Sequence, residues 1–512
     1  MIFFRRQNKK PKKPVSKPIQ SSPQSAINPQ VSDNIAEIKK IFNETPDLVI
    51  RQFIIKQTQS SAALVYLSGL TDKKAIHNHV LTPLLFEINH ENKNQDPAVS
   101  LGHVETTSEW SKIESSILEG NSVLFIAEKT EAFIFSTQGF PQRAIEDSQI
   151  EPSLRGAHQG FTESSGQNIA LVRRHIPNRE LKIKEMTVGR RGKTKISILY
   201  LADVAEPDVL KELEDRINQL NVDSVLNTGM LAEFIEDNPY SPFPQLMLTE
   251  RPDTAALHLL EGRYVTVVDK SPSVLIVPAA FVNFFESIDD YGTRWGVASF
   301  IRFLRYVAFF IAIFLPSIYI AVITFHAEII PIKLLISIGL SRERVPFPPI
   351  IEAFIMELTL EMLREAGVRL PSPIGQTVGI VGGIVIGQAA VEAGIVSNIM
   401  VIVVALTAIA SFIIPNYDMG AAIRILRFPM MILAAVFGFL GLAIGFMVII
   451  GDFIALESMG TPYGSPLAPL RFSDLKDALI RFPAWSFVKR SETSRAVQLK
   501  KAETDHPKGD SH

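Results

Sequence analysis

The chain has no cysteine among its 512 residues. Disulfides, thiolate metal sites and cysteine nucleophiles are therefore excluded. The formal net charge is only -2, from 51 basic and 53 acidic residues, so no overall field indicates a nucleic-acid partner. The sequence also lacks an HExxH motif, a Walker-type loop and a GxSxG motif. We therefore expect no enzymatic activity, no catalytic residue, no metal site and no cofactor.

The N-terminus lacks the apolar core of a secretory signal peptide. Residues 1–31 are basic at first and then rich in proline, serine and glutamine, a composition that cannot bury enough apolar surface to fold. This tail either binds anionic lipid on the cytoplasmic face or is a solvated tail that keeps its end of the chain inside by charge. The residues alone leave both interpretations open.

Hydropathy then predicts an α/β soluble region of two related lobes, at 32–150 and 151–290. In each lobe a helix ends at Leu-Glu-Gly (residues 118–120 and 260–262), and two short apolar segments follow at the same spacing. Upstream, 64–67 and 198–201 each resemble the end of a strand before a helix. The duplication predicts a cleft between the lobes, which is either a ligand site or part of a docking scaffold.

An α-helical transmembrane domain is expected at 291–455, followed by a cytoplasmic tail at 456–512. Uncharged runs at Tyr306–Phe325, Leu370–Val391, Ala393–Tyr417 and Phe428–Gly451 predict four spans. A fifth is possible at 350–366, although its charges also fit a helix that lies at the interface, re-enters the membrane or is buried in an assembly. Arginines before the first span predict a cytoplasmic N-terminal domain.

Four glycines at a strict four-residue spacing lie in or next to the second uncharged run. They form a bare ridge on which another helix can pack closely: Gly375, Gly379, Gly383 and Gly387. The opposite face of the same helix carries a different row with a 4-3-4-3-4 spacing. This row contains Ile374, Val378, Val381, Val385, Gln388 and Glu392.

The second row suggests a pore lining. A carboxylate next to a membrane span is costly unless it meets water or a partner, and rings of carboxylates select cations. In an oligomer the valines would form an apolar constriction and gate, and Gln388 with Glu392 would form a wet mouth. The alternative is a lipid-facing valine strip in which Glu392 only marks the end of the helix.

Residues 346–397, PFPPIIEAFIMELTLEMLREAGVRLPSPIGQTVGIVGGIVIGQAAVEAGIVS, combine the acidic helix, the LREAGVRLP turn and the glycine helix. This region resembles the signature of the GerA-type spore germinant receptor A subunit family, and the resemblance extends over nearly the whole chain. The related stage V sporulation AF type shares the same architecture.

The resemblance implies a place and a function. Members of this family lie in the inner membrane of the bacterial spore and work with a transporter-like B subunit and a lipoprotein C subunit. The A subunit is expected to form a homo-oligomeric, nutrient-gated ion channel. Two alternatives remain: a non-conducting membrane scaffold or accessory protein of the spore's ion and dipicolinate release machinery, and a secondary transporter, which the lack of a visible repeat of spans disfavours.

Overall fold

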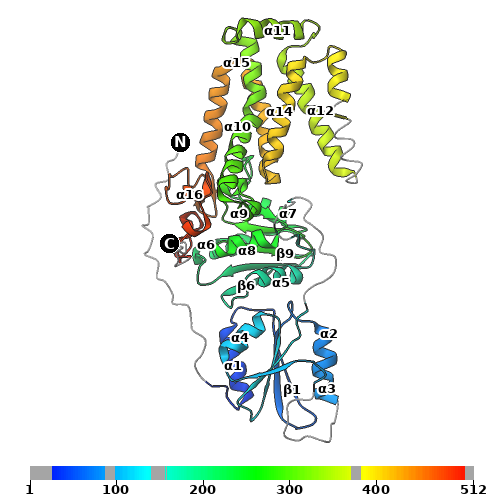
Figure 1. Cartoon of the computed structure of the whole chain (residues 1–512), viewed down its shortest axis with the longest axis vertical. Helices are drawn as coiled ribbons and strands as arrows, with labels where there is room; N and C mark the ends of the chain where they lie inside the picture. Colours follow the sequence, from blue (N-terminus) through cyan, green and yellow to red (C-terminus); the bar gives the residue numbers. More distant parts are fainter. Residues whose placement is uncertain are drawn as a thin grey trace, which may run out of the picture. The chain divides into compact units, whose positions relative to one another are not determined.

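The computed structural model describes residues 26–86, 99–139, 151, 156, 158–370, 382–383 and 385–501. Contacts divide the chain into two compact units, each of which is discontinuous in sequence (Figure 1). The first unit contains Met1–Ile235, Leu246–Pro278 and Trp485–His512, and the second contains Glu236–Gln245 and Ala279–Ala484.

The first lobe of the first unit is a five-stranded antiparallel sheet with helices on both faces (Figure 1). The strand order is β1-β2-β4-β5-β3. The strands are β1 (Leu48–Ile54), β2 (Ser61–Leu67), β3 (Val104–Thr107), β4 (Ser122–Ile126) and β5 (Ala132–Phe135). The helices are α1 (Val31–Ile41), α2 (Lys73–Ala75), a π-helix (Ile76–Leu81), α3 (Thr82–Phe86) and α4 (Trp110–Leu118).

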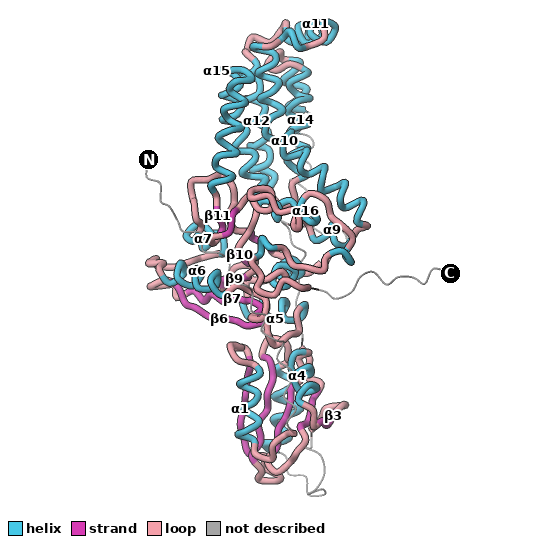
Figure 2. Tube along the Cα trace, turned by 90° about the vertical axis from the view of Figure 1, so that its left-hand side faces the viewer, coloured by secondary structure: helices cyan, strands magenta, loops and turns pink. Residues whose placement is uncertain are grey.

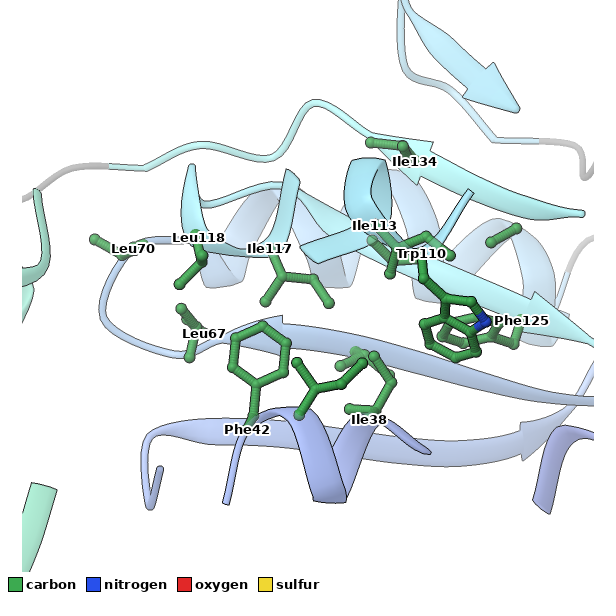
Figure 3. Packing of buried hydrophobic residues seen from close by; sticks show 14 of the residues in the cluster. Ile38, Phe42, Leu67, Leu70, Trp110, Ile113, Ile117, Leu118, Phe125 and Ile134 are labelled. Atoms are coloured by element: carbon green, nitrogen blue, oxygen red, sulfur yellow. The ribbon is translucent and has the colours of Figure 1, made fainter. Parts of the chain in front are cut away.

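Alternation along the central strands explains the two-sided core, because successive side chains in a strand point to opposite faces. Val65 and Phe125 pack under α1 and α4, and Leu64 and Leu124 pack under the π-helix and α3. Figure 3 shows the first of these clusters, in which the ring of Trp110 lies 5.9 Å from that of Phe125.

The second lobe repeats the architecture of the first, with the strand order β6-β7-β9-β10-β8. Gly120 and Gly262 end the equivalent helices with φ near +90°, a conformation that favours glycine. The two sheets therefore share one strand order, as the predicted duplication requires. The strands are β6 (Leu181–Val188), β7 (Thr194–Leu201), β8 (Met247–Thr249), β9 (Tyr264–Val268) and β10 (Val274–Val277). The helices are α5 (Ser165–His175), α6 (Pro207–Asn218), α7 (Thr228–Ile235) and α8 (Pro252–Leu260).

Polar contacts join the two lobes within the first unit. The guanidinium of Arg173 on α5 donates from Nε and Nη2 to the two oxygens of Asp47, at 2.7 and 2.9 Å. The amide of Ile183 on β6 donates to the carbonyl of Glu44 at 3.0 Å. A cleft of about 480 Å³ lies beside these contacts, between the 39–50 region and β6. Its charged lining residues are two lysines and two glutamates, so the cleft itself carries no net charge.

Residues 485–501 return to the second lobe. The amide of Val497 donates to the carbonyl of Val204 at 2.8 Å, and Arg490 Nε donates to the carbonyl of Leu260 at 2.7 Å. Lys501 forms an ion pair with Glu261. Residues 485–501 are therefore part of the first unit, whereas the preceding residues 456–484 belong to the second.

The second unit is mainly helical (Figure 2). Two of its described helices, α10 and α15, are long and apolar enough to cross a membrane, and α14 is a shorter apolar helix. The helices are α9 (Ile288–Gly292), α10 (Trp295–Phe325), α11 (Ile332–Arg342), α12 (Pro349–Arg369), a short helix at 385–392, α14 (Asn398–Ile413), α15 (Tyr417–Ala455) and α16 (Leu475–Ala478). Two short strands, β11 (Glu457–Ser458) and β12 (Thr461–Pro462), form a hairpin after α15.

The chain reverses direction within α15, at Gly438, whose φ of +60° and ψ of -136° are not helical. A Cβ on Gly441 would lie 2.0 Å from the carbonyl oxygen of Leu433, and one on Gly445 would lie 2.3 Å from Met430 Sδ. In a straight helix Met430 and Gly445, 15 residues apart, would be separated by about 22 Å. Their close approach therefore requires two antiparallel arms. The prediction of one continuous span at Phe428–Gly451 is therefore wrong. An apolar run gives no sign of the direction of the chain, and this one contains a turn.

Contacts along α10 fix the direction of both arms of α15. Arg427 on the first arm donates from Nε to the carbonyl of Ala312 at 2.8 Å, and the turn at Gly438 lies against His326. On the second arm, the ring of Phe446 lies 5.7 Å from that of Phe314. The first arm thus runs parallel to α10 and the second arm runs antiparallel to it.

Candidate functional site

In the described part of the glycine helix, residues 382–383 and 385–392, Gly387 is the only buried residue. A Cβ on it would lie 3.7 Å from Val401 Cγ1 on α14. Val385, Gln388 and Glu392 are exposed, and Gln388 Nε2 donates to Glu392 Oε1 at 3.0 Å. Gly383 has no heavy atom within 4 Å of a built Cβ.

The remaining predicted residues of this helix lie outside the described part of the chain. They are the pore-lining candidates Ile374, Val378 and Val381 and the packing candidates Gly375 and Gly379. The pore-lining and glycine-packing assignments therefore remain predictions for the whole row. In the described part, the side chains of the first row are exposed and one glycine of the second row contacts a neighbouring helix.

Two acidic residues in the first half of α12 are buried within the second unit. Glu352 is fully buried, pairs with Arg342 of α11 at 3.1 Å, and accepts a hydrogen bond from the amide of Ser397 at 2.9 Å. Glu357 is also buried and pairs with Arg427 of α15. Each buried carboxylate thus meets an arginine from another helix, which is how intramembrane charges are normally tolerated.

A third acidic residue of α12 lies in a more open position. Arg424 of α15 donates from Nε to Glu361 Oε1 at 3.1 Å, and Arg364 Nη1 lies 3.5 Å from Glu361 Oε2. Arg364 Nη2 also donates to Ser411 Oγ of α14 at 3.2 Å. The side chain of Glu361 is 43% exposed, against 3% for that of Glu357. This half-buried cluster therefore has two guanidinium groups for one carboxylate.

A separate set of buried charges fixes the start of α10. Asp290 accepts a bidentate pair from Arg305, with Nη1–Oδ2 at 2.7 Å and Nη2–Oδ1 at 2.9 Å, and a third bond from Arg302 Nη2 at 3.2 Å. Arg302, which is fully buried, also reaches Asp477 Oδ1 at 3.1 Å. We call Asp290, Arg302, Arg305 and Asp477 the Asp290 hub.

The hub ties α9 and α10 to the segment that follows α15. Tyr291 next to it donates its hydroxyl to Asp477 Oδ2 at 3.0 Å. Burial raises the pKa of Tyr291 well above its ordinary value, which keeps this hydroxyl protonated and able to donate. The entry into α10 and the exit from α15 are therefore held together by hydrogen-bonded charges.

The sequence predictions missed the partners of the α12 carboxylates. Arg342, Arg364, Arg424 and Arg427 were assigned no role from the sequence. The sequence did contain a usable signal: acidic residues occur in one apolar region and arginines in another. Because intramembrane charges usually pair, this pattern predicts ion pairs between the two regions. Among the described residues, no cluster of three or more histidine, aspartate or glutamate side chains could hold a metal ion.

Comparison with known proteins identifies relatives over most of the chain. The family model described as Bacillus/Clostridium GerA spore germination protein matches residues 36–493. Spore germination protein KA of Bacillus subtilis is 43% identical over 488 residues, which cover 94% of this chain and 90% of that protein. Spore germination protein GerLA of Bacillus cereus is 38% identical over 455 residues, covering 87% and 92% of the two chains.

Among solved structures, the N-terminal domain of the A subunit of the Bacillus megaterium spore germinant receptor GerK3 is 31% identical, with a TM-score of 0.39. The match covers 51% of this chain and 99% of that one. The resemblance predicted from residues 346–397 is confirmed by the family match and by the full-length relatives. The chain belongs to the GerA spore germination protein family.

Proposed function

We propose that this protein is the A subunit of a spore germination receptor and forms a homo-oligomeric, nutrient-gated ion channel. Family membership supports the role in germination. The exposure of Val385, Gln388 and Glu392 on the described helix at 385–392 is the observation that supports the channel. The proposed setting is the inner membrane of the spore, with the transporter-like B subunit and the lipoprotein C subunit as partners.

The exposed row of the helix fits a water-filled path. Val385 is 57% exposed in the single chain, and Gln388 and Glu392 are exposed along the same face. An ionised carboxylate exposed beside apolar helices is costly unless it meets water or another subunit. Several copies with this face turned inward would place the valines in a constriction that gates by dewetting, with a ring of Glu392 carboxylates at its mouth.

The path of the chain supports an even number of membrane crossings. Residues 485–501 bind to the same unit from which the chain departs at Pro278, so both must lie on one side of the membrane. The two arms of α15 replace one of the four predicted spans by two, which gives five crossings. A further crossing by α12 makes the number even. We infer six crossings, with the N-terminal domain in the cytoplasm as the arginines before α10 indicate.

Conduction is tested by a substitution that adds a hydroxyl group to the proposed constriction without changing the shape of the side chain. Val385→Thr keeps the branched side chain and adds a polar group, so it should wet the constriction and cause spores to lose monovalent cations without nutrient. Val436→Thr is the matched control, since Val436 of α15 is 56% exposed and lies outside the proposed lining. Ion release from dormant spores is measured for both variants.

Two outcomes separate the channel from the alternative. A leak with Val385→Thr and none with Val436→Thr supports conduction. If Val385→Thr spores keep their ions and Glu392→Gln spores release them normally on addition of nutrient, the protein is a non-conducting scaffold.

A further inference from the structure

A half-buried charge cluster of the second unit has an excess of positive charge. It contains Arg364 of α12, Arg424 of α15, and Glu361 of α12 between them, with Ser411 of α14 beside Arg364. We call these four residues the arginine pocket. The charged groups that act on Arg364 are Glu357, Glu361, Arg424 and Arg427, and Glu357 is already paired with Arg427.

The surplus charge is not neutralised elsewhere in this region. Residues 371–381 and Ile384, which lie outside the described part, contain no charged side chain. Within the described residues, Arg424 makes one hydrogen bond, from Nε to Glu361, and its two Nη atoms make none. Four N–H donors of one guanidinium are therefore available to a ligand.

The pocket lies close to one edge of the apolar region. Arg427 is level with Ala312 of α10, and Arg424 precedes it by three residues, about 4.5 Å nearer to the start of α10. The uncharged run of α10 begins at Tyr306, only six residues before Ala312. The pocket is thus at the depth at which lipid headgroups meet the hydrocarbon.

The surroundings of the pocket are aromatic and apolar. The Arg364 guanidinium lies 4.7 Å from the ring centre of Phe412, and that of Arg424 lies 5.9 Å from the ring centre of Tyr417. These rings are 71% and 53% exposed, as expected of aromatic residues at a membrane interface. Ile409 and Ile425, next to them in α14 and α15, are also exposed.

We propose that the arginine pocket binds the phosphate of an anionic phospholipid in the leaflet on the side of the N-terminal domain. Guanidinium groups bind phosphate oxygens in a bidentate manner. Ser411, whose hydroxyl donates to the carbonyl of Ala408 at 2.7 Å, accepts from Arg364 and holds it in place. The acyl chains lie along Phe412, Ile409 and Ile425. The proposal depends on the membrane placement of the second unit and is independent of ion conduction.

The experiment titrates full-length protein in detergent with phosphatidylglycerol and follows bound lipid by native mass spectrometry. Arg424→Gln should weaken binding about fivefold, the effect of one basic side chain at a membrane surface. Glu361→Gln should strengthen binding by a similar factor, because it removes the carboxylate that competes with phosphate. Arg369→Gln is the matched control, since this arginine of α12 is exposed and paired with Glu365.

Each result decides the proposal. Weaker binding by Arg424→Gln together with tighter binding by Glu361→Gln supports it, and Glu361→Gln alone remains decisive if the arginine variant does not fold. Unchanged affinity in Glu361→Gln overturns it, as does equal binding of phosphatidylcholine. Full competition by inorganic phosphate would assign the pocket to free phosphate instead of lipid.

Discussion

Replacing Asp290 by asparagine should strongly destabilise the second unit. The carboxylate is 2% exposed and is the shared acceptor of Arg302 and Arg305. Asparagine keeps the shape and one acceptor oxygen, but it removes the negative charge that Arg302 and Arg305 share. Removing one member of a buried ion pair typically costs about 3–5 kcal/mol.

That loss is a large fraction of the usual stability of a folded unit, about 5–15 kcal/mol. For a unit of this size it corresponds to a fall in Tm of roughly 6–20 °C, to be measured by thermal unfolding of the purified full-length protein in detergent. Glu365→Gln is the control, because it breaks an exposed pair with Arg369 worth at most about 1 kcal/mol. A fall in Asp290→Asn no larger than in Glu365→Gln would refute the argument.

Two further predictions concern other parts of the chain. Burial raises the pKa of Glu151 from 4.5 to about 7, so its contribution to stability is fully present below pH 4.5 and falls, by at most about 3 kcal/mol, as the pH rises to 7. Glu151→Gln should flatten the dependence of Tm on pH in this range, and an unchanged slope contradicts the assignment. Gly438→Ala should lower stability by about 1–3 kcal/mol, because alanine does not fit its backbone conformation and the new Cβ would lie 3.1 Å from His326 Nε2. Gly451→Ala in the same helix meets open space and should not lower Tm; equal Tm values for the two variants would disprove the turn.

The two lobes could be predicted from the sequence because their signals are local. A helix that ends at glycine and two short apolar strands recur at one spacing, and the strands and turns form where that pattern places them. The exposed row of Val385, Gln388 and Glu392 likewise follows from helical periodicity.

The turn in α15 and the charge pairs could not be predicted in the same way. Gly441 and Gly445 have the spacing of a ridge for another helix, but they pack against the first arm of their own hairpin. The pair between Glu357 and Arg427 joins residues 70 positions apart, and periodicity within one helix contains no information about such a partner. These features depend on how helices meet, which hydropathy does not describe.

The hydrogen bond from Val497 to Val204 has a consequence for biosynthesis. The ribosome makes every helix of the second unit before it makes residues 485–501, which bind to the second lobe. A nascent chain stalled or cleaved after α15 would expose the surface around Val204, so proteases and chaperones could distinguish unfinished copies from finished ones. The binding of residues 485–501 to the second lobe thereby reports that all the preceding helices have been synthesised.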